Sequence, residues 1–216
     1  MVSGLYQLVR KNGPDRYCCG VDTRQRILDG ATESFGTDGY DATSLDALAA
    51  ALGVSKQTVL YHFGSKDRLL EATIDHAASE LMMLVEKRIA DTSGWPAVEA
   101  VVSAVFRVAT RRPALLGLLR EVMRLGAPWS TRASTALDPL VVRARDWLAS
   151  EMDAGRMRRT DPRLLLVSAY STVMGVATEV EVLRAVGIEP TLRATVARRR
   201  ELIDFLHSAL VTPGLV

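Results

Sequence analysis

The chain has 216 residues, of which 48% are hydrophobic and 6% aromatic, and its formal net charge at pH 7 is +2. This length allows one or two domains with a sizeable core, and the abundance of Ala, Leu and Val favours helices over sheets. The longest uncharged apolar run, Leu164 to Thr178, is shorter than the roughly 20 residues of a membrane helix, so no membrane span is predicted. The first twenty residues do not resemble a secretory signal, and we expect a cytoplasmic protein.

The N-terminal arm, residues 1–20, carries both cysteines of the chain, Cys18 and Cys19. Adjacent cysteines do not readily bridge each other, and they lack the CxxC spacing of zinc and redox sites. Two free thiols in a flexible arm are therefore the simplest interpretation. A thiol sensor is the alternative, with Arg16 as the only nearby group that would lower a thiol pKa.

The segment 43–66 predicts two short helices joined by a tight turn. Thr43 and Asp46 suit a capping box in front of an apolar run at helical spacing. Gly53 supplies the turn, because glycine enters the left-handed backbone region without a steric penalty, and Ser55 can cap the next helix. The exposed front of that helix consists of Lys56, Gln57 and Thr58. This build is typical of a helix-turn-helix, whose second helix enters the major groove of DNA.

From Thr23 to about Leu70 the chain resembles the DNA-binding domain of the tetracycline-repressor (TetR) family of bacterial regulators. The matching positions are Phe35, Gly39, Tyr40, Thr43, Ser44, Tyr61, His62, Phe63 and Lys66. Leu60 departs from the family pattern, which usually has a tyrosine there, so Tyr61 is left to supply the expected phosphate contact. Gln57 stands where the family usually has a small residue. The resemblance implies a repressor that a small-molecule effector releases from double-stranded operator DNA.

The resemblance implies a set of DNA-contacting residues around the second short helix: Thr43, Ser55, Lys56, Gln57, Thr58, Tyr61, His62 and Lys66. The segment 21–66 holds four basic and six acidic residues, a net charge of −2, so its composition alone does not predict DNA binding. The placement of the basic residues does predict DNA binding, because Lys56 and Lys66 stand at the two ends of the predicted recognition helix.

Prolines and glycines divide the rest of the chain into further helices. Ser65 caps a long helix with an apolar stripe at steps of four and three, and Gly155 ends a later helix that reaches Met152. Helix starts are predicted at Pro96, Pro113, Pro128, Pro162 and Pro190. We predict an all-α protein of about nine helices, with a three-helix helix-turn-helix DNA-binding domain over 21–66 and a larger helical effector-binding and dimerisation domain over 67–216.

The segment Leu164 to Val176 is apolar nearly all round and needs cover on several faces. The chain's own core is one possible cover. The resemblance implies another, a homodimer in which the last two helices of each subunit form a four-helix bundle. Such a dimer suits a palindrome whose half-sites lie roughly 34–36 Å apart. We expect a charge at Val173 or Leu206 to split it.

The resemblance also implies an effector pocket between the helices of the larger domain. Candidate wall residues are Trp95, Met123, Trp129, Trp147, Tyr170 and Met174, with Glu179 as a possible partner for a cationic ligand. Ordinary helix packing is the alternative for each of them.

No phosphate loop, nucleophile elbow or metal-ligand spacing is present in the sequence, so we predict neither an enzyme nor a bound cofactor or metal. A helical small-molecule carrier or enzyme with a merely structural helix-turn-helix, and an effector-independent DNA-binding protein, are the remaining alternatives.

Overall fold

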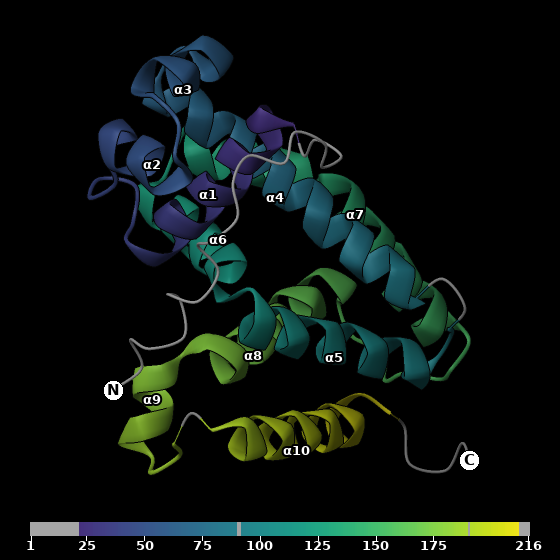
Figure 1. Cartoon of the computed structure of the whole chain (residues 1–216). Coiled ribbons are helices and arrows are strands. Elements are labelled where there is room, and N and C mark those ends of the chain that lie inside the picture. The colour runs from purple at the N-terminus through teal and green to yellow at the C-terminus, as the bar shows by residue number, and fades with distance from the viewer. Residues whose placement is uncertain (1–21, 90–91, 190, 212–216) are drawn as a thin grey trace.

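The computed structural model describes residues 22–89, 92–189 and 191–211, which form ten helices and no β-strand (Figure 1). The interpretations of residues 1–20, with Cys18 and Cys19, and of Pro190 fall outside the described residues. The predicted all-α class is confirmed. No helix in these ranges is both long enough and apolar enough to cross a bilayer.

The first three helices form a small unit, which we call the head. They are α1 (Thr23–Thr37), α2 (Leu45–Leu52) and α3 (Lys56–Phe63). Apolar residues at helical spacing on α1, from Ile27 to Phe35, meet Leu48 of α2 and Val59 of α3, and all four of these side chains are buried. Burial of this one face leaves the polar faces of α2 and α3 to solvent.

The start of α2 differs from the sequence prediction by one residue. Ser44, not Thr43, is the N-cap, and its hydroxyl accepts a hydrogen bond from the Ala47 N–H at 3.0 Å. The Thr43 hydroxyl instead donates to the Gly39 carbonyl at 2.8 Å within the preceding turn. The predicted capping box of Thr43 and Asp46 is therefore wrong, because the hydroxyl of Thr43 is already engaged.

The turn between α2 and α3 follows the prediction. Gly53 has φ 66° and ψ 32°, the left-handed region in which a side chain is strained. Ser55 caps α3, since its hydroxyl accepts from the Thr58 N–H at 3.0 Å. Ser65 likewise accepts from the Arg68 N–H at 3.1 Å, at the start of α4 (Lys66–Ile89). Three local capping signals thus set the helix-turn-helix and its exit.

Six more helices follow in the described residues: α5 (Trp95–Arg111), α6 (Pro113–Leu125), α7 (Trp129–Asp153), α8 (Pro162–Thr178), α9 (Val180–Ala185) and α10 (Leu192–Leu210). The proline-marked starts at Pro96, Pro113, Pro128 and Pro162 agree with these bounds to within one residue. Helix α9 was not predicted, because six residues are too few to show a helical period.

Two main cores hold these helices together. The larger core joins the head to α4, α6 and α7, and the smaller one joins α5, α8 and α10. In Figure 1, α4 and α7 run side by side away from the head, and α10 lies at the far side from it. The body therefore presents α8 and α10 at the end away from α3.

The residues expected to hold two subunits together are buried within one chain. Val173 and Leu206 are 8% and 5% exposed and pack with Val102 and Phe106 of α5. A charge at either position would disrupt the fold of the subunit itself, so neither position can test the dimer interface separately from folding. The apolar side chains that α8 and α10 leave exposed are Leu164, Val167, Tyr170, Leu192, Val196 and Phe205.

Candidate nucleic-acid interface

Helix α3 divides into a buried side and an exposed front. Val59 and Phe63 anchor the buried side, with 1% and 7% of their surface exposed. Lys56 and Gln57 are exposed, whereas Thr58 is half-buried and its hydroxyl is hydrogen-bonded to Ser55 Oγ at 2.8 Å. A short helix held by two buried residues presents its polar front with little freedom to tilt.

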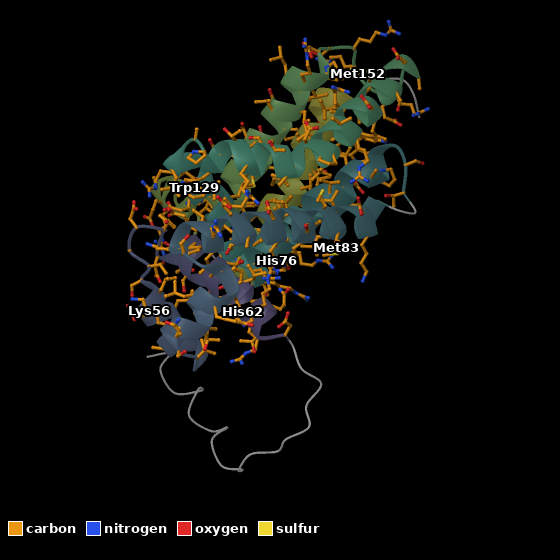
Figure 2. The ribbon with its side chains drawn as sticks, turned by 90° about the horizontal axis from the view of Figure 1, so that it is seen from above. Lys56, His62, His76, Met83, Trp129 and Met152 are labelled. Carbon is orange, nitrogen blue, oxygen red and sulfur yellow. The ribbon has the colours of Figure 1, made fainter. Side chains whose placement is uncertain are left out.

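Lys56 already has an acidic neighbour. Its Nζ lies 2.8 Å from the Asp46 carboxylate, with the two side chains 49% and 69% exposed. An ion pair this exposed contributes only about 0–1 kcal/mol, so Lys56 can exchange Asp46 for a phosphate or a base at small cost. Figure 2 shows Lys56 and His62 together at one end of the molecule, opposite Met152.

The end of α3 carries two adjacent rings. Tyr61 is 84% exposed, and its ring centroid lies 5.4 Å from that of half-buried His62 in an edge-on arrangement. The family pattern has a tyrosine at the position of Leu60. Leucine is apolar, so this half-buried side chain adds no polar group there. Tyr61 is therefore the aromatic hydroxyl available at this surface.

Two arginines beside α3 escaped the sequence interpretation. The Arg24 guanidinium lies 5.2 Å from the centroid of the Phe63 ring, and the Arg68 side chain runs past Gly64. Neither guanidinium has a carboxylate partner among the residues that the structure describes. Arg24 lies in the first turn of α1 and Arg68 in the first turn of α4, and both turns belong to or adjoin the head. These positions are the signal by which the sequence could have indicated the two arginines. They place two cations without a carboxylate partner in the described residues next to α3.

The remaining predicted contacts lie where the head meets α4. Lys66 Nζ lies 4.2 Å from the centroid of the Tyr40 ring, and the Tyr40 hydroxyl donates to the Asp67 carboxylate. Burial and then the Asp67 carboxylate raise the pKa of Tyr40, so its hydroxyl stays protonated and acts as a donor. Thr43 is only 6% exposed and lies behind this group.

Residues 27–73 match the family model described as bacterial regulatory proteins, tetR family. The segment is a TetR-family DNA-binding domain. The chain is therefore a DNA-binding transcriptional regulator, as the motif around α3 predicted.

Proteins similar to this chain are also transcriptional regulators. The transcriptional repressor AcnR of Corynebacterium efficiens is 29% identical over 160 residues, 71% of this chain and 79% of its own. The repressor Rv1474c of Mycobacterium tuberculosis is 30% identical over 139 residues, 64% of this chain and about half (52%) of its own length. A transcriptional regulator from Saccharomonospora viridis, solved in complex with choline, shares the fold with a TM-score of 0.73 at 18% identity, over 88% of this chain and 97% of that one.

The predicted pocket residues do not line one cavity. Trp95 lies edge-on to His207 at 4.7 Å, Trp129 lies 6.2 Å from the Tyr40 ring, and Trp147 packs against the Met152 cluster. Met123 and Tyr170 are exposed, Met174 packs against the larger core, and Glu179 pairs with Arg120 at 3.1 Å. The structure spreads these side chains over several surfaces of the body.

A small apolar cavity lies elsewhere, between α4, α6 and α7, with a volume of about 20 Å³. Its walls are Ile74, Ala77, Ala78, Leu81, Leu115, Leu118, Leu119, Val122, Ala133 and Leu137. The sequence carried only a weak signal for this cavity. The signal is the presence of alanines among larger apolar residues at helical spacing. Within the described ranges, no group of three or more His, Cys, Asp or Glu side chains is arranged to hold a metal.

Proposed function

We propose that this regulator is a repressor that binds its operator as a homodimer and is released by a small-molecule effector. The observation that carries the proposal is α3, whose exposed front of Lys56 and Gln57 is fixed by buried Val59 and Phe63. Two curated relatives are described as repressors, and the similar structure from Saccharomonospora viridis contains choline. The protein would act in the cytoplasm, where its DNA lies, and without catalysis.

The proposed division of labour follows the fold. Residues 21–66 bind DNA, and residues 67–216 bind the effector and the second subunit. Lys56, Gln57 and Thr58 read base edges, since they form the first turn of the helix that enters the groove. Backbone phosphates are held by Ser55, Tyr61, His62 and Lys66, and we add Arg24 and Arg68 to this group. Thr43, which the sequence also suggested, is buried with its hydroxyl bonded to the Gly39 carbonyl, so it holds the turn before α2 instead.

The proposed dimer uses the outward faces of α8 and α10. Val167 is 63% exposed, and Leu192 and Phe205 are 75% and 60% exposed. Large apolar side chains gathered on two neighbouring helices mark a protein interface. A two-fold axis through this surface would place two heads on one face of the DNA, as a palindromic operator requires.

A gel shift with the DNA that flanks the protein's own gene tests the proposal as a whole. We expect a specific complex that survives excess random duplex. Binding to specific and random DNA alike would favour an effector-independent, architectural binder. Absence of any complex would favour a helical carrier or enzyme with a structural helix-turn-helix.

We expect Gln57→Ala to weaken specific binding by about 1–3 kcal/mol, because a side-chain contact to a base edge contributes that much to discrimination. The measurement is a gel shift on operator and on random duplex at one salt concentration. Random duplex should bind the variant nearly as well as the wild type. An equal loss on both duplexes would show that Gln57 does not read bases.

We expect Lys66→Ala to weaken binding to every duplex and to lower the salt slope by about one, because the lost ammonium no longer displaces a counterion from a phosphate. Affinities measured across a salt series give the slope. Lys87→Ala, at the exposed far end of the same helix, is the matched control and should leave the slope unchanged. The assignment of Lys66 fails if the two variants give the same slope.

A further inference from the structure

One of the four basic side chains around α3 differs from the other three. Arg24, Arg68 and Lys66 form no ion pair with a carboxylate in the part of the chain that the structure describes. Lys56 does, because its Nζ lies 2.8 Å from Oδ2 of Asp46. The paired cation is therefore the one in the first turn of α3, the turn to which we assign base reading.

Asp46 is well placed on α2 to hold this pair. It lies in the first turn of that helix, where the partial positive charge of the helix start stabilises a carboxylate. Lys56 is in the opposite situation. It stands in the first turn of α3, which contains no acidic residue, and a helix start is unfavourable for an ammonium. Asp46 thus offsets a repulsion that α3 itself does not relieve.

The first turn of α3 would attract any phosphate if Asp46 were absent. The N–H groups of a helix start and a lysine ammonium both attract anions, and neither depends on the sequence of the DNA. Asp46 already supplies an anion to Lys56, and its negative charge repels an approaching phosphate. Every duplex carries the same phosphates, so this repulsion acts against random DNA.

A contact of Lys56 with a base edge does not require the release of Asp46. A lysine ammonium has three donors and no acceptor. Asp46 uses one of them, and two remain for the acceptors of a base, such as O6 and N7 of guanine. The Lys56 side chain is 49% exposed, so these donors are accessible from solvent. A base edge carries no net charge, and it is therefore not repelled by Asp46 as a phosphate is.

We propose that Asp46 is a specificity-determining residue of the head. It keeps Lys56 away from backbone phosphates and leaves two of the lysine donors for base acceptors. Random DNA then binds more weakly, while the operator keeps its base contact, and the ratio of the two affinities rises. This inference rests on the proposed function as an operator-binding regulator.

Asp46→Asn tests the inference, because it retains the shape of the side chain and removes its charge. We expect affinity for random duplex to rise by about fivefold, the factor that corresponds to the upper end of the range for an exposed ion pair. The salt slope on random duplex should become steeper by about 0.9, since the freed Lys56 displaces one more counterion. Affinity for the operator should stay within twofold of the wild type. Gel shifts on both duplexes across a salt series give all four quantities.

Glu33→Gln is the matched control for the change in net charge. Glu33 is exposed on α1 and makes no ion pair with Lys56. We expect this variant to bind both duplexes within twofold of the wild type and with unchanged salt slopes. The double variant Lys56→Ala/Asp46→Asn shows whether Asp46 acts through the lysine. Compared with Lys56→Ala alone, the added Asp46→Asn change should have no more effect than Glu33→Gln, because the ammonium is gone.

Two results would overturn the inference. An equal gain on operator and random duplex would show that Asp46 does not discriminate between them. A full gain in the Lys56→Ala background would show general repulsion that does not involve Lys56. If circular dichroism shows that Asp46→Asn is unfolded, Asp46→Ser provides the same neutral change and the same expected gains. A wild type that binds operator and random duplex alike would instead contradict the proposed function, which is a different result.

Discussion

Phe205→Glu is expected to convert the proposed dimer into monomers and to abolish operator binding at concentrations where the wild type is saturated. Phe205 is 60% exposed in the single chain and lies on α10 with the outward-facing Leu192 and Val196. A charge left unpaired in an apolar interface costs about 3–5 kcal/mol, and the two-fold axis places two of them in one interface. Sedimentation measures the loss of the dimer, and a gel shift measures the loss of binding.

Met83→Glu is the matched control for this prediction. Met83 is also 60% exposed, but it lies on α4, which Figure 1 shows apart from α10. We expect this variant to stay dimeric and to bind the operator normally. A Phe205→Glu protein that sediments as a dimer would show that α10 does not form the interface.

Phe35→Ala is expected to lower the free energy of unfolding by about 3–5 kcal/mol, the cost of emptying a fully buried phenylalanine site. Phe35 is 0% exposed, and its ring centroid lies 5.5 Å from that of Tyr40, which Glu121 and Lys66 contact. The empty space left by the lost Phe35 ring would loosen both the head and its attachment to α6. Urea denaturation followed by circular dichroism gives the free energy of unfolding.

Tyr61→Ala removes an aromatic ring of similar size at a position that is 84% exposed. We expect its free energy of unfolding to stay within about 0.5 kcal/mol of the wild type, because an exposed side chain leaves no cavity. Its affinity for DNA should fall nonetheless, through the lost phosphate contact. Equal stability losses in the Phe35 and Tyr61 variants would contradict the described packing of the head.

Local signals in the sequence were sufficient for the helix-turn-helix. Gly53 and Ser55 act within a few residues of themselves, through backbone conformation and a capping hydrogen bond, so their roles can be predicted without the fold. The start of α2 could not be placed in the same way. Thr43 and Ser44 are both good caps, and the hydrogen bond from Thr43 to the Gly39 carbonyl leaves Ser44 as the cap.

The apolar stripes of α8 and α10 were also evident in the sequence, but their neighbours were not. Helical periodicity shows which residues share a face, and it cannot show whether that face meets the same chain or another. The structure turns Val173 and Leu206 toward α5 and leaves Phe205 outside. Phe205, and not Val173 or Leu206, is therefore the residue suited to testing a dimer.

The sequence by itself determined the helical class, the proline-marked helix starts and the turn that leads into α3, because each depends on residues close together in the chain. Only the tertiary structure decided the cavity between α4, α6 and α7 and the contact of Gly117 with Gly36. Both join segments far apart in the sequence, and neither an alanine nor a glycine within a helix indicates which distant backbone will approach it. Close packing among helices selects those partners, since only small residues allow two backbones to come so near.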